Sequence, residues 1–68
     1  MSYKLGEPVL YQDVIRTTLG FITKVPTEYE PVYQITWHDQ ERGEFILHYK
    51  ESAVGIYKRC LDRYMNPE

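Results

Sequence analysis

Residues 32–50 contain two segments of alternating apolar and polar residues, and the second is nearly the mirror image of the first. If they pair as an antiparallel hairpin around residues 39–43, one face collects three apolar pairs: Trp37 with Phe45, Ile35 with Leu47, and Tyr33 with Tyr49. A shift of the register by one residue would send these side chains to opposite faces. The sequence therefore predicts a hairpin with one buried face, in which Gly43 supplies the positive φ that such a turn commonly needs.

Two further strands are predicted before this hairpin. Residues 9–15 are rich in β-forming side chains, and Pro8 stands at the start of the strand, where proline is tolerated. Residues 16–18 are expected to form a turn, and residues 19–25 a second strand of β-branched and aromatic residues. Gly20 inside that strand indicates a bulge or a close approach to the backbone. Residues 26–31 form a polar loop with a proline at each end.

The segment after Lys50 has two interpretations. Apolar side chains recur there at helical spacing, namely at Val54, Tyr57, Leu61 and Tyr64. Ser52 is an acceptable N-cap for such a helix, and Asn66-Pro67 is a reasonable stop. Gly55 argues against it, because glycine in a helix interior costs about 1 kcal/mol relative to alanine. The alternative makes Gly55 a turn, residues 56–60 a short fifth strand and residues 61–64 a helical turn.

The chain has 68 residues, a net charge of −2 and a single cysteine, Cys60. This length predicts one domain that spans residues 1–68. One cysteine and two histidines provide neither an internal disulfide nor the ligands of a structural zinc site, so no metal or other cofactor is expected. A lone thiol is typical of a reducing compartment, and no apolar run suggests a signal peptide or a membrane span. We therefore expect a cytoplasmic protein without membrane contact.

Residues 7–50 resemble the small SH3-like barrels, especially the Tudor-like branch. The residues that carry this resemblance are Glu7-Pro8-Val9, Leu19-Gly20-Phe21-Ile22 and the run from Tyr33 to Asp39. The Gly-Asp opening of such barrels stands here as Gly6-Glu7. The resemblance implies a mainly β fold: a small barrel of four to five antiparallel strands with a C-terminal helical turn or short helix. It also implies binding, to methylated lysine or arginine, proline-rich peptides, nucleic acid or a second copy.

Tudor-like modules hold a methylated cation against several aromatic faces by cation–π attraction, often with a carboxylate nearby. The candidates for such a ligand-binding cage are Tyr11, Tyr29, Trp37 and Tyr49, with Asp39 as the carboxylate. The competing interpretation places Trp37 and Tyr49 in the core, because the hairpin puts them on its apolar face. Tyr29 differs from them, since it stands in the polar loop between two glutamates, where burial is least expected.

A second candidate site is basic. Lys50, Lys58, Arg59 and Arg63 lie among tyrosines near the C-terminus, an arrangement that suits stacking on nucleic-acid bases. The competing interpretation is the solvated face of an amphipathic segment, and the acidic net charge favours it. Metal binding by His38 and His48 is not expected, because the predicted register separates them by roughly 13 Å on the polar face. Zinc–nitrogen bonds are only about 2 Å long.

Catalysis is not expected either. No histidine stands within ten residues of Cys60, and the chain contains no phosphate-binding glycine loop or paired-carboxylate pattern. The acidic middle of the chain and its basic C-terminal segment, together with the helical stripe, predict a homodimer. The sequence thus favours a non-catalytic binding or assembly module with a protein or peptide partner. A nucleic-acid-associated accessory protein is the alternative.

Overall fold

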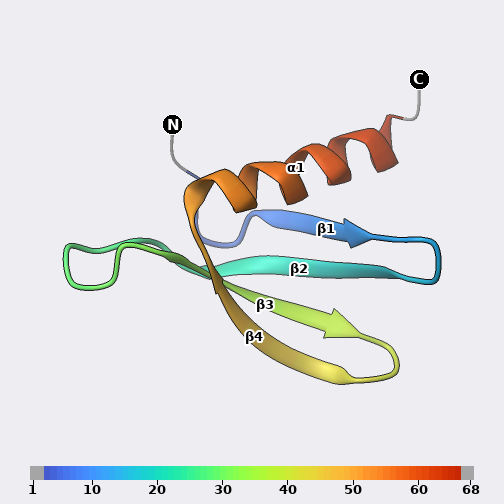
Figure 1. The fold of residues 1–68 in the computed structure, drawn as a ribbon, viewed down its shortest axis with the longest axis horizontal. Coiled ribbons are helices and arrows are strands. Elements are labelled where there is room, and N and C mark those ends of the chain that lie inside the picture. Colours follow the sequence, from blue (N-terminus) through green and yellow to red (C-terminus); the bar gives the residue numbers. More distant parts are fainter. Residues whose placement is uncertain (1–2, 67–68) are drawn as a thin grey trace.

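The computed structural model describes residues 3–66, which form four strands followed by one helix (Figure 1). The elements are β1 (Pro8–Gln12), β2 (Thr17–Lys24), β3 (Tyr33–Asp39), β4 (Gly43–Tyr49) and α1 (Glu51–Met65). The strands form one open antiparallel sheet of order β1-β2-β3-β4, so β1 and β4 are its two edges. The mainly β class, the antiparallel strands and the C-terminal helix are thereby confirmed. No helix in residues 3–66 is both long enough and apolar enough to cross a membrane.

The register of the β3–β4 hairpin agrees with the sequence prediction. Trp37 is paired with Phe45, Ile35 with Leu47, and Tyr33 with Tyr49. The three β3 members of these pairs are buried, whereas their β4 partners are only partly covered. Gly43 has the expected positive φ, of 80°. One face of this hairpin therefore belongs to the core along β3 and becomes open to solvent toward the β4 edge.

The β1–β2 turn lies earlier than the sequence predicted. It occupies residues 13–16 instead of residues 16–18, so β1 ends at Gln12 and β2 already begins at Thr17. The cause is Asp13, whose Oδ1 accepts hydrogen bonds from the backbone N–H groups of Ile15 and Arg16, each at 2.9 Å. Such a side-chain cap stabilises a turn locally. Val14 and Ile15, which look like strand residues, are exposed in this turn.

The C-terminal segment is a helix, and the fifth-strand alternative is wrong. Val54 is fully buried in the core. Gly55 is also buried, and the hydroxyl oxygen of Tyr3 would lie only 3.0 Å from a Cβ at that position. The helix starts earlier than predicted, since Lys50 is its N-cap and Ser52 lies inside the first turn. At the other end Asn66 is the C-cap, and its N–H donates to the Asp62 carbonyl at 2.9 Å. Pro67 lies outside the described residues.

The core lies between one face of the sheet and the first half of α1. It consists of Val9, Ile22, Tyr33, Ile35, Trp37 and Val54. Figure 1 shows that α1 runs along β1, while β4 lies on the far side of the sheet and approaches the helix only where the chain passes from one to the other. The helix therefore covers β1 well and leaves much of the inner face of β4 uncovered.

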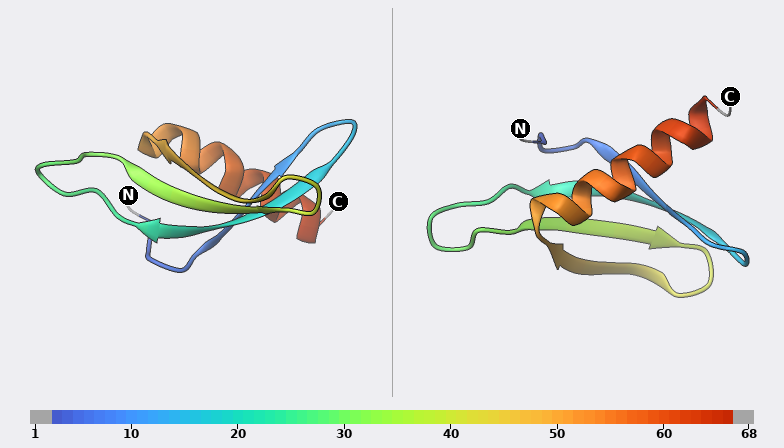
Figure 2. Two further views of the ribbon diagram at one scale, coloured as in Figure 1. Left: turned by 90° about the horizontal axis from the view of Figure 1, so that it is seen from below. Right: turned by 45° about the horizontal axis from the view of Figure 1, so that its top comes forward.

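The molecule is elongated, with principal-axis extents of 36 × 29 × 17 Å. The β2–β3 loop lies at one end of the long axis (Figure 1, left), and the β1–β2 and β3–β4 turns lie together at the other end. Both views in Figure 2 show the same separation. This arrangement places the acidic β2–β3 loop far from the site that the other two turns border.

Candidate binding pocket between β4 and the helix

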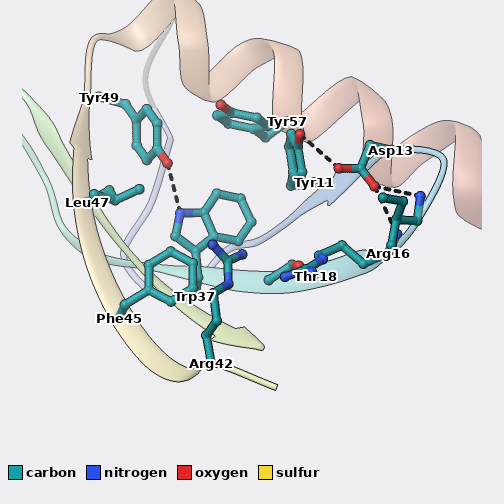
Figure 3. Close-up of a pocket in the computed structure, with 11 residues that line it drawn as sticks. Tyr11, Asp13, Arg16, Thr18, Trp37, Arg42, Phe45, Leu47, Tyr49 and Tyr57 are labelled. Atoms are coloured by element: carbon teal, nitrogen blue, oxygen red, sulfur yellow. Dashed lines mark hydrogen bonds between the residues drawn. The ribbon is translucent and has the colours of Figure 1, made fainter. Parts of the chain in front are cut away.

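A pocket of about 490 Å³ opens where α1 diverges from β4 (Figure 3). Its volume falls within the range of about 300–1,000 Å³ that is usual for ligand pockets. Side chains from all four strands, from the β1–β2 and β3–β4 turns and from α1 line it. They are Tyr11, Asp13, Ile15, Arg16, Thr18, Trp37, Arg42, Phe45, Leu47, Tyr49 and Tyr57.

Four aromatic rings form one wall of the pocket. Tyr57 of α1 stands at their centre, with its ring centroid 5.3 Å from that of Trp37, 5.2 Å from that of Tyr49 and 6.2 Å from that of Tyr11. All three pairs are edge-to-face, the geometry that aromatic quadrupoles prefer. Such an interlocked cluster holds each ring in place, so the apolar wall exists before any ligand arrives.

A hydrogen bond fixes the far end of this wall. The indole Nε1–H of Trp37 donates to the Tyr49 hydroxyl oxygen at 2.9 Å, as the dashed line in Figure 3 marks. Burial raises the pKa of Tyr49 above its usual value, so the phenol stays protonated at neutral pH and contributes no charge. Trp37 itself is only 3% exposed and acts mainly as the floor beneath the other rings.

The opposite end of the pocket is charged. Asp39, whose side chain is 5% exposed, accepts from Arg42 Nε at 2.8 Å and lies 3.4 Å from Arg16 Nη1. The backbone N–H of Arg42 donates to the same carboxylate oxygen at 2.9 Å. These hydrogen bonds from Arg42 lower the pKa of Asp39, and Arg16 adds to the effect. Because Arg16 belongs to the β1–β2 turn, Asp39 ties the two turns together.

Arg42 is the cation in this wall with the most donors left over. Its guanidinium lies over the Phe45 ring, with Cζ 4.7 Å from the ring centroid. Only its Nε has an acceptor among residues 3–66, namely Asp39, so Nη1 and Nη2 have no protein partner there. Arg16 differs, because it also forms an ion pair with Glu41 at 3.4 Å. The stacked Arg42 thus presents two N–H-bearing groups beside an apolar surface.

The acidic residue of the lining is already engaged. Asp13 Oδ1 accepts from two backbone N–H groups of its own turn, and Oδ2 accepts from the Tyr11 hydroxyl at 3.2 Å. The backbone hydrogen bonds, led by that from Arg16, lower the pKa of Asp13. The bond to Asp13 in turn raises the pKa of Tyr11. Asp13 therefore serves the turn and holds Tyr11 in place.

Thr18 carries a hydroxyl without a partner. The residue is 2% exposed, and its Oγ1 has no hydrogen bond within residues 3–66. A buried polar atom left unsatisfied costs about 1–3 kcal/mol. Thr18 lies in the pocket wall, but its Oγ1 atom is almost completely shielded from the pocket space.

The structure brings together three of the five residues proposed for an aromatic cage. Tyr11, Trp37 and Tyr49 all line the pocket. Tyr29 does not, because it lies in the β2–β3 loop at the other end of the molecule, 90% exposed. Asp39 lies just behind the pocket with its carboxylate engaged by two arginines. The carboxylate that would attract a methylated cation is therefore neutralised.

The four basic residues proposed for nucleic acid do not form one cluster. Lys50 precedes the helix, and Arg59 and Arg63 are exposed one turn apart further along it. Lys58 Nζ lies 4.0 Å from Glu7 Oε2 and is partly buried. The charge of Lys58 is thus partly compensated by Glu7, in the segment before β1.

Sequence reasoning missed several members of the pocket. Phe45 and Leu47 followed from the hairpin register, but their exposure did not, because the position of the helix decides it. Tyr57 was assigned to a helical stripe and to the aromatic residues beside the basic segment, but not to a pocket. Arg16 and Arg42 stand in two separate turns, and no spacing in the sequence indicates that these turns meet at Asp39.

Comparisons with known protein families, with curated proteins and with solved structures found no match to this chain. The resemblance to Tudor-like barrels therefore stays a prediction. Within residues 3–66 no group of three or more histidine, cysteine or acidic side chains is placed to hold a metal ion. Cys60 is a free, half-buried thiol. The pocket is therefore the feature of this molecule that points to a function.

Proposed function

We propose that this protein is a non-catalytic binding module that takes an apolar or aromatic side chain of a protein partner into the pocket between β4 and α1. The observation that carries the proposal is the uncovered inner face of β4. Leu47 is 46% exposed there, next to the half-buried rings of Phe45 and Tyr49, in front of a pocket of about 490 Å³. A concavity that combines an apolar wall with a few placed polar groups is the usual form of a binding site.

The charges around the pocket favour a partner in which acidic residues adjoin the inserted side chain. Arg42 keeps two donor groups without a partner among residues 3–66, whereas Asp13 has both of its carboxylate oxygens in hydrogen bonds. A carboxylate next to the inserted side chain gains a charge-assisted hydrogen bond from the guanidinium. A methylated cation has less support, because Asp39 is held by Arg42 and Arg16.

The edge position of β4 supports a partner that is a polypeptide. An edge strand has unpaired backbone groups on its outer side, and an extended segment can pair with them while its side chains enter an adjacent pocket. The ligand that fits is therefore a protein segment with an aromatic side chain flanked by aspartate or glutamate.

A selection from a random displayed heptapeptide library tests this function. We expect the immobilised protein to enrich peptides in which an aromatic residue adjoins acidic residues. Leu47→Asp places a carboxylate in the pocket mouth and should abolish the enrichment. Ile46→Asp is the matched control, because Ile46 is 52% exposed on the same strand but points to the other face of the sheet. It should leave the enrichment intact.

Two results would contradict the proposed function. One is the absence of any enriched sequence on the wild-type protein. The other is enrichment that survives Leu47→Asp, which would place the binding surface elsewhere. Salt-sensitive binding of a single-stranded RNA that is lost in Arg59→Ala/Arg63→Ala would instead support the nucleic-acid alternative.

A further inference from the structure

The β2–β3 loop carries the chemistry that the pocket selects. Tyr29 stands at the loop between Glu28 and Glu30, and its side chain is among the most exposed of the large apolar residues, at 90%. Both glutamates are exposed as well. An aromatic ring in solvent with a carboxylate on each side matches the occupant argued for above.

The loop holds Tyr29 in a defined conformation. Thr27 Oγ1 accepts hydrogen bonds from the backbone N–H groups of Tyr29 at 3.3 Å and Glu30 at 3.0 Å. The backbone N–H of Thr27 donates to the Glu30 carbonyl at 3.0 Å, and a proline stands at each end of the loop. A segment already ordered in this way loses less conformational entropy when it docks.

Tyr29 is too far away to enter the pocket of its own chain. The loop lies at one end of the longest axis of the molecule, and the turns that border the pocket lie at the other end (Figures 1 and 2). Tyr29 can therefore meet a pocket of this kind only on another molecule, and a second copy of the chain provides one.

We propose that the partner of the pocket is a second copy of this chain, whose Tyr29 inserts between β4 and α1. This assignment rests on the proposed function. The second copy's Glu28 and Glu30 then lie beside Arg42, whose Nη1 and Nη2 have no partner within residues 3–66. The rings of Tyr11, Tyr49 and Tyr57 supply the apolar contact.

The resulting contact joins two different surfaces, so it is heterologous. After the first contact one copy still has a free pocket and the other still has a free loop, so further copies can add until a ring closes or a filament grows. The contact differs in this respect from a symmetric dimer through paired β4 edges or through the exposed helix end, in which the same surface of each copy is used.

Sedimentation equilibrium of single variants and of their mixture tests the proposal. The wild-type protein should have an average mass above the 8.2 kDa of one chain, rising with concentration. Tyr29→Ser removes the inserted ring, and Leu47→Asp blocks the pocket, so each variant alone should sediment as a monomer. An equimolar mixture should form a dimer and nothing larger, because only one intact loop and one intact pocket are left to meet.

Matched controls separate this contact from general loss of solubility or fold. Tyr64→Ser removes an exposed tyrosine from the helix end, and Ile46→Asp charges the other face of β4. Both should assemble as the wild type does. Tyr29→Phe should also assemble as the wild type does, because the ring that enters the pocket is kept.

A wild-type protein that is monomeric at millimolar concentration would overturn the proposal, and so would an oligomer that survives Tyr29→Ser. A mixture of Tyr29→Ser and Leu47→Asp that stays monomeric would overturn it as well. Any of these results would leave the peptide selection valid if that selection succeeds, so failure of this inference is distinguishable from failure of the proposed function.

Discussion

The indole of Trp37 lies against Gly20 so closely that a Cβ at residue 20 would be 2.6 Å from its Cε3 atom. The two residues are directly paired between β2 and β3. The glycine is therefore required by the ring that crosses it. This contact sets the depth of Trp37, and through Trp37 it sets the floor of the pocket on which Tyr49 and Tyr57 rest.

Gly20→Ala should destabilise the protein by about 1–3 kcal/mol, the usual cost of overpacking a core. The added methyl would also approach Ile35, whose Cγ2 lies 2.9 Å from the ideal Cβ position, so neither neighbour leaves room. Urea denaturation followed by Trp37 fluorescence measures the change. A variant as stable as the wild type would mean that the indole does not lie over residue 20.

Gly55→Ala should stabilise the protein, in contrast to Gly20→Ala. Its Cβ would lie 3.0 Å from the hydroxyl oxygen of Tyr3 and 3.6 Å from Arg59 Nη1, and both atoms are the ends of flexible side chains that can move away. The gain in helix propensity, about 1 kcal/mol, should then dominate and raise the free energy of unfolding. A loss of stability in the same urea experiment would show that Tyr3 is held rigidly over the helix.

Trp37→Ala should destabilise the fold by about 3–5 kcal/mol, because it removes a large side chain that is only 3% exposed. That is a large part of the stability of so small a domain. Trp37→Phe should destabilise the fold less, since it keeps an aromatic ring. It should still be less stable than the wild type, because it loses the hydrogen bond to Tyr49. Thermal unfolding followed by circular dichroism gives both values, and a Trp37→Ala melting point within a degree or two of wild type would contradict the burial.

Asp39→Asn should destabilise the protein at neutral pH and have less effect in acid. The folded-state pKa of Asp39 is lowered from its ordinary 3.8 by hydrogen bonds from Arg42. Its contribution is therefore fully present above about pH 5 and is lost as the pH falls through the folded-state pKa. Urea midpoints of wild type and variant, measured from pH 7 down to pH 2, should converge. A constant difference would show that the carboxylate is not the stabilising group.

The sequence predicted the β3–β4 hairpin well because a period of two with one apolar face allows a single register. The helical stripe was predicted as well, although Gly55 kept a short fifth strand as an alternative for the same segment. What decides that question is tertiary packing of one helix face on the sheet, which no local pattern in residues 51–66 contains. The stripe packs on the sheet through Val54 and Tyr57, and its end at Tyr64 stays 55% exposed.

The pocket could not be predicted in the same way. Its existence depends on α1 lying along β1 instead of crossing to β4, and helical periodicity fixes which face packs but not where the helix lies. Val14 and Ile15 suggested strand, whereas the side chain of Asp13 makes a turn there. Only that turn brings Arg16 to Asp39 and closes the charged end of the site.

The most direct test of the pocket is a titration of ¹⁵N-labelled Tyr29→Ser protein with a capped peptide of residues 26–32, followed by nuclear magnetic resonance. We predict saturable shifts of the Trp37 indole N–H and of the amides of Phe45, Leu47 and Tyr57. A peptide with serine in place of tyrosine should produce none, and neither should the parent peptide added to a Leu47→Asp/Tyr29→Ser variant. Shifts confined to the other face of the sheet, or no shifts at millimolar peptide, would contradict the account.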